Sequence, residues 1–78
     1  MNEEKPTQEY STHDTVLAAY LQCKGITLLR VEKEQSISFV FSEPPQELLA
    51  AFHMCTAEVN VAAFFKSYKD MLKRVHGR

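Results

Sequence analysis

The chain has 78 residues, a formal net charge of −1 and an apolar fraction of 45%. A chain of this length forms one domain that buries about 60–65% of the surface its unfolded form exposes, so its stability is small. The near-neutral net charge argues against a generally basic nucleic-acid-binding protein, and the three prolines and two glycines argue against low complexity. The apolar run at residues 61–65, which no run outside the predicted first helix exceeds, is far too short to span a bilayer.

Residues 1–11 predict a flexible acidic arm, and residues 12–78 predict a single domain. The first eight residues, MNEEKPTQ, offer nothing to bury, and Pro6 interrupts regular structure. An alternative for residues 8–11 is a short edge strand, because Tyr10 needs a buried environment. The arm has no apolar core of the kind that a signal peptide requires, so we expect a cytoplasmic protein.

Thr12 to Lys24 predicts the first helix. Thr12 suits the N-cap because its hydroxyl can accept a backbone N–H of the first turn, and Asp14 lies where the helix dipole favours an acid. Gly25 can adopt the left-handed conformation that ends many helices. The predicted apolar face comprises Val16, Leu17, Ala19, Tyr20, Leu21 and Cys23.

Residues 26–41 predict a β-hairpin, because β-branched and aromatic residues dominate the runs ITLLRVE and SISFVF. A loop of three residues at 33–35 places Leu29 opposite Phe39 and Val31 opposite Ile37. These four residues and Phe41 then form one apolar face. The register determines which side chains are buried, since a slip of one residue exchanges the two faces of a strand.

The opposite face of this hairpin carries Leu28 and Val40 beside Arg30 and Ser38. A sheet of only two strands is marginally stable, so an uncovered apolar pair predicts either a third strand or a second subunit. We therefore expect Leu28 and Val40 to be candidate interface residues. The partner is another protein or a second copy of the chain, and a homodimer would offset the small size of the core.

Residues 42–56 and 60–75 predict two further helices. Pro44 and Pro45 fit a helix start, where the missing N–H costs nothing, and Asn60 suits the N-cap of the last helix. The predicted fold class is α+β in the order α-β-β-α-α, with three helices packed against an antiparallel hairpin. The last helix has an apolar stripe at helical spacing, which comprises Val61, Phe64, Phe65, Tyr68, Met71, Leu72 and Val75.

Several of these features resemble a family of short prokaryotic and phage proteins classed as a domain of unknown function. The resemblance spans nearly the whole chain after Tyr10, but the hairpin turn lacks the glycine that the family pattern would have there. It implies the fold and a phage or mobile-element context, and it transfers no catalytic residue. The matching residues are Thr12, Asp14, Leu17–Leu21, Gly25, Phe39–Phe41, Phe52, Phe64, Tyr68–Lys69 and Leu72–Lys73.

No motif for catalysis or for metal binding emerges from the sequence. His53 and Cys55 are the only closely spaced pair of zinc-ligand types, but two positions apart on a helix their side chains diverge. Cys23 and Cys55 lie on predicted apolar faces, where free cysteine behaves as a small buried hydrophobe. We expect no enzyme, and we assign no catalytic residue, metal, cofactor or small-molecule substrate.

Charge is distributed unevenly along the chain. Residues 1–14 hold four acids and one base, whereas residues 66–78 hold five bases and one acid. A basic helical face can neutralise phosphates, so candidate nucleic-acid-binding residues are Lys66, Lys69, Lys73 and Arg74. However, the stripe assigns Phe64, Phe65 and Tyr68 to the core, which leaves no exposed aromatic ring for a base to stack on.

Two functions therefore remain open at this point. The first is a small interaction protein that serves a phage or mobile element through protein–protein contacts, with the basic face only solvated. The second is a nucleic-acid-associated protein that contacts the phosphate backbone through the last helix. The first function predicts binding that is indifferent to salt, and the second predicts binding that weakens steeply as salt rises. No membrane partner is expected.

Overall fold

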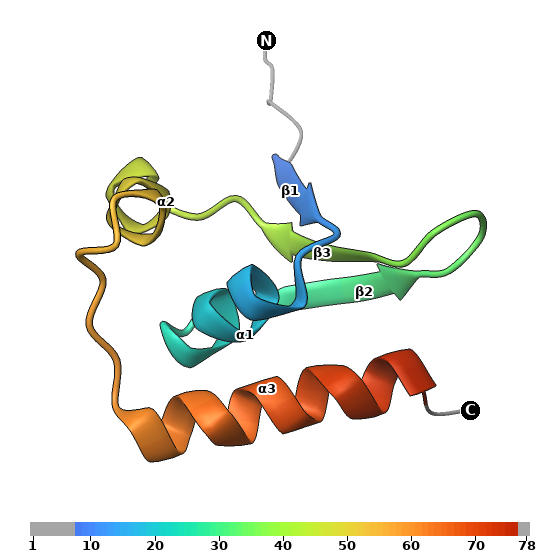
Figure 1. Ribbon diagram of the computed structural model, residues 1–78. Helices are drawn as coiled ribbons and strands as arrows, with labels where there is room; N and C mark the ends of the chain where they lie inside the picture. The colour runs from blue at the N-terminus through green and yellow to red at the C-terminus, as the bar shows by residue number, and fades with distance from the viewer. Residues whose placement is uncertain (1–7, 77–78) are drawn as a thin grey trace, which may run out of the picture.

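The computed structural model describes residues 8–76 of the chain. Six elements follow one another in the order β-α-β-β-α-α, so the fold is α+β as predicted (Figure 1). The predicted flexible arm comprises residues 1–11. Residues 1–7 of it lie outside the described residues, and residues 9–11 are part of a strand. The elements are β1 (Glu9–Thr12), α1 (Thr15–Cys23), β2 (Leu28–Glu32), β3 (Ser38–Ser42), α2 (Gln46–His53) and α3 (Val61–His76).

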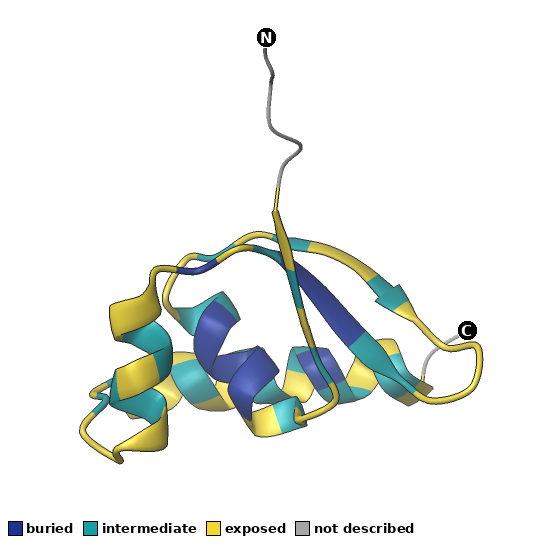
Figure 2. Ribbon diagram, turned by 90° about the horizontal axis from the view of Figure 1, so that it is seen from above, coloured by how far each residue is buried: buried dark blue, intermediate teal, exposed yellow. Residues whose placement is uncertain are grey.

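The three strands form one antiparallel sheet in the order β1-β3-β2, so the predicted edge strand is confirmed. Tyr10 pairs with Phe41 across β1 and β3, and it packs against the core as its apolar ring requires. α1 and α3 lie side by side on one face of this sheet (Figure 1). The buried core residues come from α1, from the central strand β3 and from Met71 of α3, and Pro44 in the connection between β3 and α2 is buried as well (Figure 2).

The N-terminal end of α1 differs from the prediction by three residues. Asp14 is the N-cap, and its Oδ1 accepts the backbone N–H groups of Val16 at 2.9 Å and Leu17 at 3.4 Å. Thr12 is the last residue of β1, and its hydroxyl accepts the N–H of Asp14 at 3.1 Å. The predicted cap at Thr12 is wrong because β1 takes that residue into the sheet.

Both α1 and α2 end in the same backbone motif, in which a left-handed residue closes the last turn. After α1 this residue is Gly25, as predicted, with φ of 89°, and the N–H of Ile26 donates to the carbonyl of Leu21 at 3.0 Å. After α2 it is Cys55, with φ of 61°, and the N–H of Thr56 donates to the carbonyl of Ala51 at 2.9 Å. α2 therefore ends at His53, three residues before the predicted boundary.

The β2–β3 register also differs from the prediction. Val31 lies opposite Phe39 instead of Ile37, because the loop spans residues 33–37 and is two residues longer than expected. A bulge between Leu28 and Arg30 then shifts the pairing again. As a result Leu28 packs against the core opposite Phe41, whereas Leu29, predicted to be inside, is 42% exposed.

One exposed ion pair crosses the outer face of the sheet, and a second joins two residues of β2. Arg30 of β2 donates to Glu9 of β1 at 2.8 and 3.1 Å, and to Glu32 at 2.8 Å. Because β3 lies between those strands, the Arg30 side chain crosses over its pairing partner Val40, which is only 3% exposed. The predicted shared face of Leu28 and Val40 is therefore wrong, and the two side chains do not form an exposed patch.

α2 makes few contacts with the rest of the molecule. None of its residues is buried. The hydroxyl of Tyr20 donates to the carbonyl of Leu48 at 2.9 Å, and the rings of Tyr20 and Phe52 lie with their centroids 5.2 Å apart. Desolvation by burial raises the pKa of Tyr20. Among residues 8–76, no helix is long and apolar enough to cross a membrane.

Candidate nucleic-acid interface on the last helix

The orientation of α3 determines which of its side chains reach solvent. Asn60 caps the helix as predicted, since its Oδ1 accepts the N–H of Ala63 at 2.9 Å. Met71 is fully buried, and half-buried side chains flank it along the face that packs on α1 and the sheet. These flanking residues are Phe64, Ser67, Tyr68, Asp70 and Val75.

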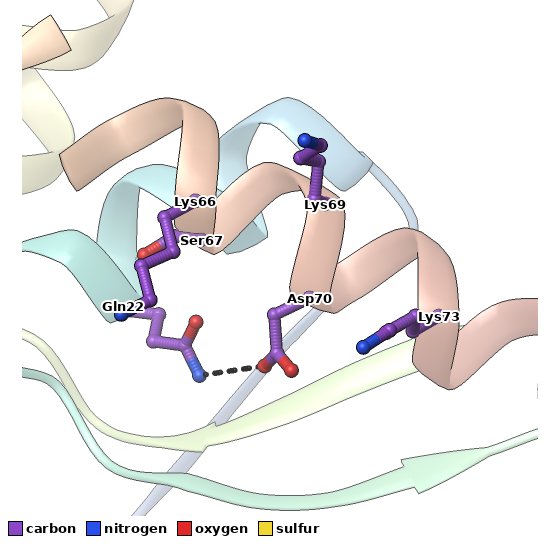
Figure 3. Close-up of a pocket in the computed structure, with 6 residues that line it drawn as sticks. All are labelled: Gln22, Lys66, Ser67, Lys69, Asp70 and Lys73. Atoms are coloured by element: carbon purple, nitrogen blue, oxygen red, sulfur yellow. Dashed lines mark hydrogen bonds between the residues drawn. The ribbon is translucent and has the colours of Figure 1, made fainter. Parts of the chain in front are cut away.

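The face of α3 opposite Met71 carries three lysines that we call the lysine face: Lys66, Lys69 and Lys73. Their spacing of three and four residues places them within about 60° on the helix, as predicted, and all three are exposed. With Gln22 of α1, Ser67 and Asp70 they line an open hollow of about 560 Å³ (Figure 3). In this view Lys66 and Lys73 extend on either side of the Gln22–Asp70 pair.

Asp70 is the single acid of α3, and its carboxylate is engaged from two sides. It accepts hydrogen bonds from Gln22 Nε2 at 3.4 Å and from Arg74 Nε at 3.1 Å. Partial desolvation raises the pKa of Asp70, but the bonds from Arg74 and Gln22 and the charges of Arg74 and Lys73 outweigh it. The pKa therefore lies below its ordinary value, and Asp70 stays ionised at neutral pH.

Because Arg74 pairs with Asp70, it differs from the three lysines that were predicted with it to bind nucleic acid. Arg74 lies on the far side of Asp70 from the lysine face, and its guanidinium is paired with that carboxylate. Among residues 8–76 the remaining ion pairs join Arg30 to Glu9 and Glu32. Lys66, Lys69 and Lys73 make no ion pair within this part of the chain, so their charge is available to an external anion.

The structure corrects the expected position of Phe65. Its ring is 56% exposed, and the Nζ of Lys69 lies 5.0 Å from the ring centroid. Val61, predicted in the same apolar stripe, is 80% exposed. The lysine face therefore has an exposed aromatic ring beside it, contrary to the sequence-based expectation that none would be present.

The orientation of α3 could have been predicted from polar residues in the sequence that lie outside the apolar stripe. Ser67 and Asp70 lie on the flank of α3 nearest to Gln22, and both are half-buried. A hydrogen bond between α1 and this flank of α3 needs a polar residue at the end of α1 and an acid near the centre of α3, and the sequence has both. The apolar stripe alone spans about 120° at 100° per residue, so it does not specify which of its edges is covered.

The other chemically interesting side chains do not converge with this surface. Both cysteines are free, with Cys23 half-buried and Cys55 exposed, so the expected burial of Cys55 is wrong. His13 lies between β1 and α1, where its Nδ1 donates to the carbonyl of Ile37 at 2.8 Å. Within residues 8–76 no group of three His, Cys, Asp or Glu side chains is positioned to hold a metal ion.

These features define a small α+β protein whose last helix presents a basic outer face with an exposed aromatic ring beside it. The chain belongs to the family described as the domain of unknown function DUF5659, which it matches over residues 7–77. No curated protein and no solved structure matches the chain. The family confirms the resemblance seen in the sequence, whereas the phage or mobile-element context stays a prediction.

Proposed function

We propose that the protein binds nucleic acid through contacts between the lysine face and the phosphate backbone. The observation that carries this proposal is the grouping of Lys66, Lys69 and Lys73 on one exposed face without an ion pair among residues 8–76. Phosphate contacts of this kind release counterions, and that release supplies most of the free energy of non-specific binding. The two arginines of the same part of the chain are already paired with acids.

The proposal covers contacts with the backbone and does not extend to recognition of a base sequence. Three phosphate contacts predict a modest affinity at physiological salt, because the overall charge of −1 adds no general attraction. The dependence of log K on log salt concentration is expected to have a slope of about −2 for a single strand and about −3 for a duplex.

Fluorescence anisotropy tests this function with a labelled mixed-sequence strand and its duplex, each titrated at several salt concentrations. We expect binding at low salt that weakens with the slopes given above. The variant K66Q/K69Q/K73Q should lose most of the binding and flatten the salt dependence. The single change K69Q should weaken binding, whereas its matched control K33Q, which removes the same charge from the exposed β2–β3 loop, should not. Absence of binding at low salt would refute the proposal.

A second candidate function is contact with a protein partner, as an accessory protein of a phage or mobile element in the cytoplasm. The observation that favours it is the exposure of Val61 at 80% and Phe65 at 56% on the same helix. Leu28 and Val40 give it little support, since neither side chain is exposed. Sedimentation equilibrium tests the homodimer: a mass that doubles with concentration, and returns to the monomer in V61S/F65S, would support it.

A further inference from the structure

We propose that the lysine face takes single-stranded nucleic acid, and that a base stacks on the exposed ring of Phe65. This inference rests on the proposed function, because the lysines must first hold the phosphate backbone. It goes further by naming the form of nucleic acid. Only an unpaired strand can present the flat face of a base to an aromatic side chain, since both faces of a base inside a duplex are already stacked.

The first observation is the position of Phe65 relative to the lysines. Lys66 follows it directly in the chain, Lys69 lies one turn further on, and Lys73 lies two turns further on. The ring is more than half exposed, with the Lys69 ammonium 5.0 Å from its centroid. The Lys69 ammonium lies over one face of the ring, so a base would stack on the opposite face, or on the same face once Lys69 turns away to meet a phosphate.

The second observation is an apolar row that runs beside the lysine face. Phe65, Leu72 and His76 are seven and four positions apart, so they lie close to one line along α3. Leu72 and His76, with Lys69 and Lys73, line a second shallow hollow of about 350 Å³. Without a ligand, the side chains of Phe65 and Leu72 are only partly covered. Bases that lie over this row would cover their apolar surface.

The length of the lysine face fits a short run of one strand. Lys66 and Lys73 are separated by a rise of about 10 Å along the helix axis, at 1.5 Å per residue. Successive phosphates of a stacked strand rise by about 3.4 Å, so about three steps of the strand, which join four phosphates, span the same distance. A strand parallel to α3 therefore places its phosphates along the lysines and its bases over Phe65 and Leu72.

Anisotropy with three probes of the same length tests this inference: a labelled deoxythymidine strand, a duplex, and a strand of the same backbone without bases. We expect the single strand to bind about tenfold more tightly than either of the others. F65L should weaken binding of the single strand by about 5- to 150-fold, as expected for the loss of one base–aromatic stack. F65Y, which keeps the ring, should bind like the natural protein.

The controls separate the two proposals. F65L should leave the salt slope and the affinity for the baseless strand unchanged, whereas K66Q/K69Q/K73Q should reduce both. Because Phe65 is exposed, the melting temperature of F65L should stay close to that of the natural protein. Equal binding of all three probes with no effect of F65L would overturn the stacking role and leave backbone binding intact. No binding to any probe would overturn both proposals.

Discussion

Gly25 and Cys55 occupy the same position in two copies of one helix-ending motif, although their side chains differ. Glycine adopts a positive φ without penalty, whereas a residue with a Cβ loses about 1–2 kcal/mol in that conformation. Cys55, with φ of 61°, therefore carries strain that Gly25 avoids. Its exposed side chain makes no hydrogen bond and no disulfide within the described chain that would offset this cost.

We expect opposite effects from exchanging these residue types. C55G should raise the free energy of unfolding by about 0.5–1 kcal/mol, because the relief of strain exceeds the extra entropy of glycine in the unfolded chain. G25A should lower it by about 1 kcal/mol through the backbone alone, since a Cβ at Gly25 meets no atom within 4 Å. Urea denaturation measures both. C55A keeps the strained backbone and is the control, so stabilisation by C55A equal to that by C55G would contradict this account.

At the scale of the helices and strands, the sequence predicted the elements better than their orientation. The caps at Asn60 and Gly25 act through neighbouring backbone groups, so the local sequence was enough to identify them. The hairpin register was missed because a shift of two residues buries the same face of β3, and the alternation of apolar residues cannot distinguish the two. The bulge at Leu29 and the exposure of Phe65 depend on long-range packing.

The orientation of α3 makes a further prediction at this scale. M71A should lower the free energy of unfolding by about 2–5 kcal/mol, because Met71 is fully buried and its loss leaves a cavity. F65A removes a larger side chain, yet it should cost less than about 1 kcal/mol because the ring is more than half exposed. Thermal or urea unfolding compares the two. A cost for F65A as large as that for M71A would contradict this orientation and would mean that Phe65 is also covered, as the stripe predicted from sequence requires.

At the scale of the whole molecule, stability is expected to fall in acid because two carboxylates are held in their ionised form. The hydrogen bond from Arg30 lowers the pKa of Glu9 below its ordinary value of 4.5, against a smaller opposing effect of desolvation. Hydrogen bonds and nearby positive charge likewise lower the pKa of Asp70 below 3.8, although desolvation opposes them. Their stabilising effect is complete above these ordinary values and is lost as the pH falls through the lowered ones.

Urea denaturation at pH 7 and at pH 3 measures this effect. The natural protein should lose more stability between the two conditions than the variant E9Q/D70N, which has no charge to lose at either position. E34Q changes an acid in the exposed β2–β3 loop that makes no ion pair within residues 8–76, and it is the control. An acid sensitivity unchanged in E9Q/D70N would show that these two contacts do not contribute.

The candidate surface was predicted in part at this largest scale. Spacing alone identified Lys66, Lys69 and Lys73 as one face, because helical periodicity is a property of the sequence. Spacing did not show that the charge of Arg74 is already paired with Asp70. It also placed Phe65 in the core, although this residue is exposed. Phe65 is exposed because the core is small: one sheet and one helix cover only part of a stripe of seven apolar residues.

The bulge in β2 has a consequence for how the protein behaves at high concentration. β1 and β2 are both edge strands, and an edge is a template on which another chain can add a strand and begin to aggregate. At Leu29 the backbone of β2 leaves the regular spacing, so an incoming strand cannot pair along its whole length. The irregularity that exposes one leucine is thereby expected to disfavour the addition of a strand at the β2 edge.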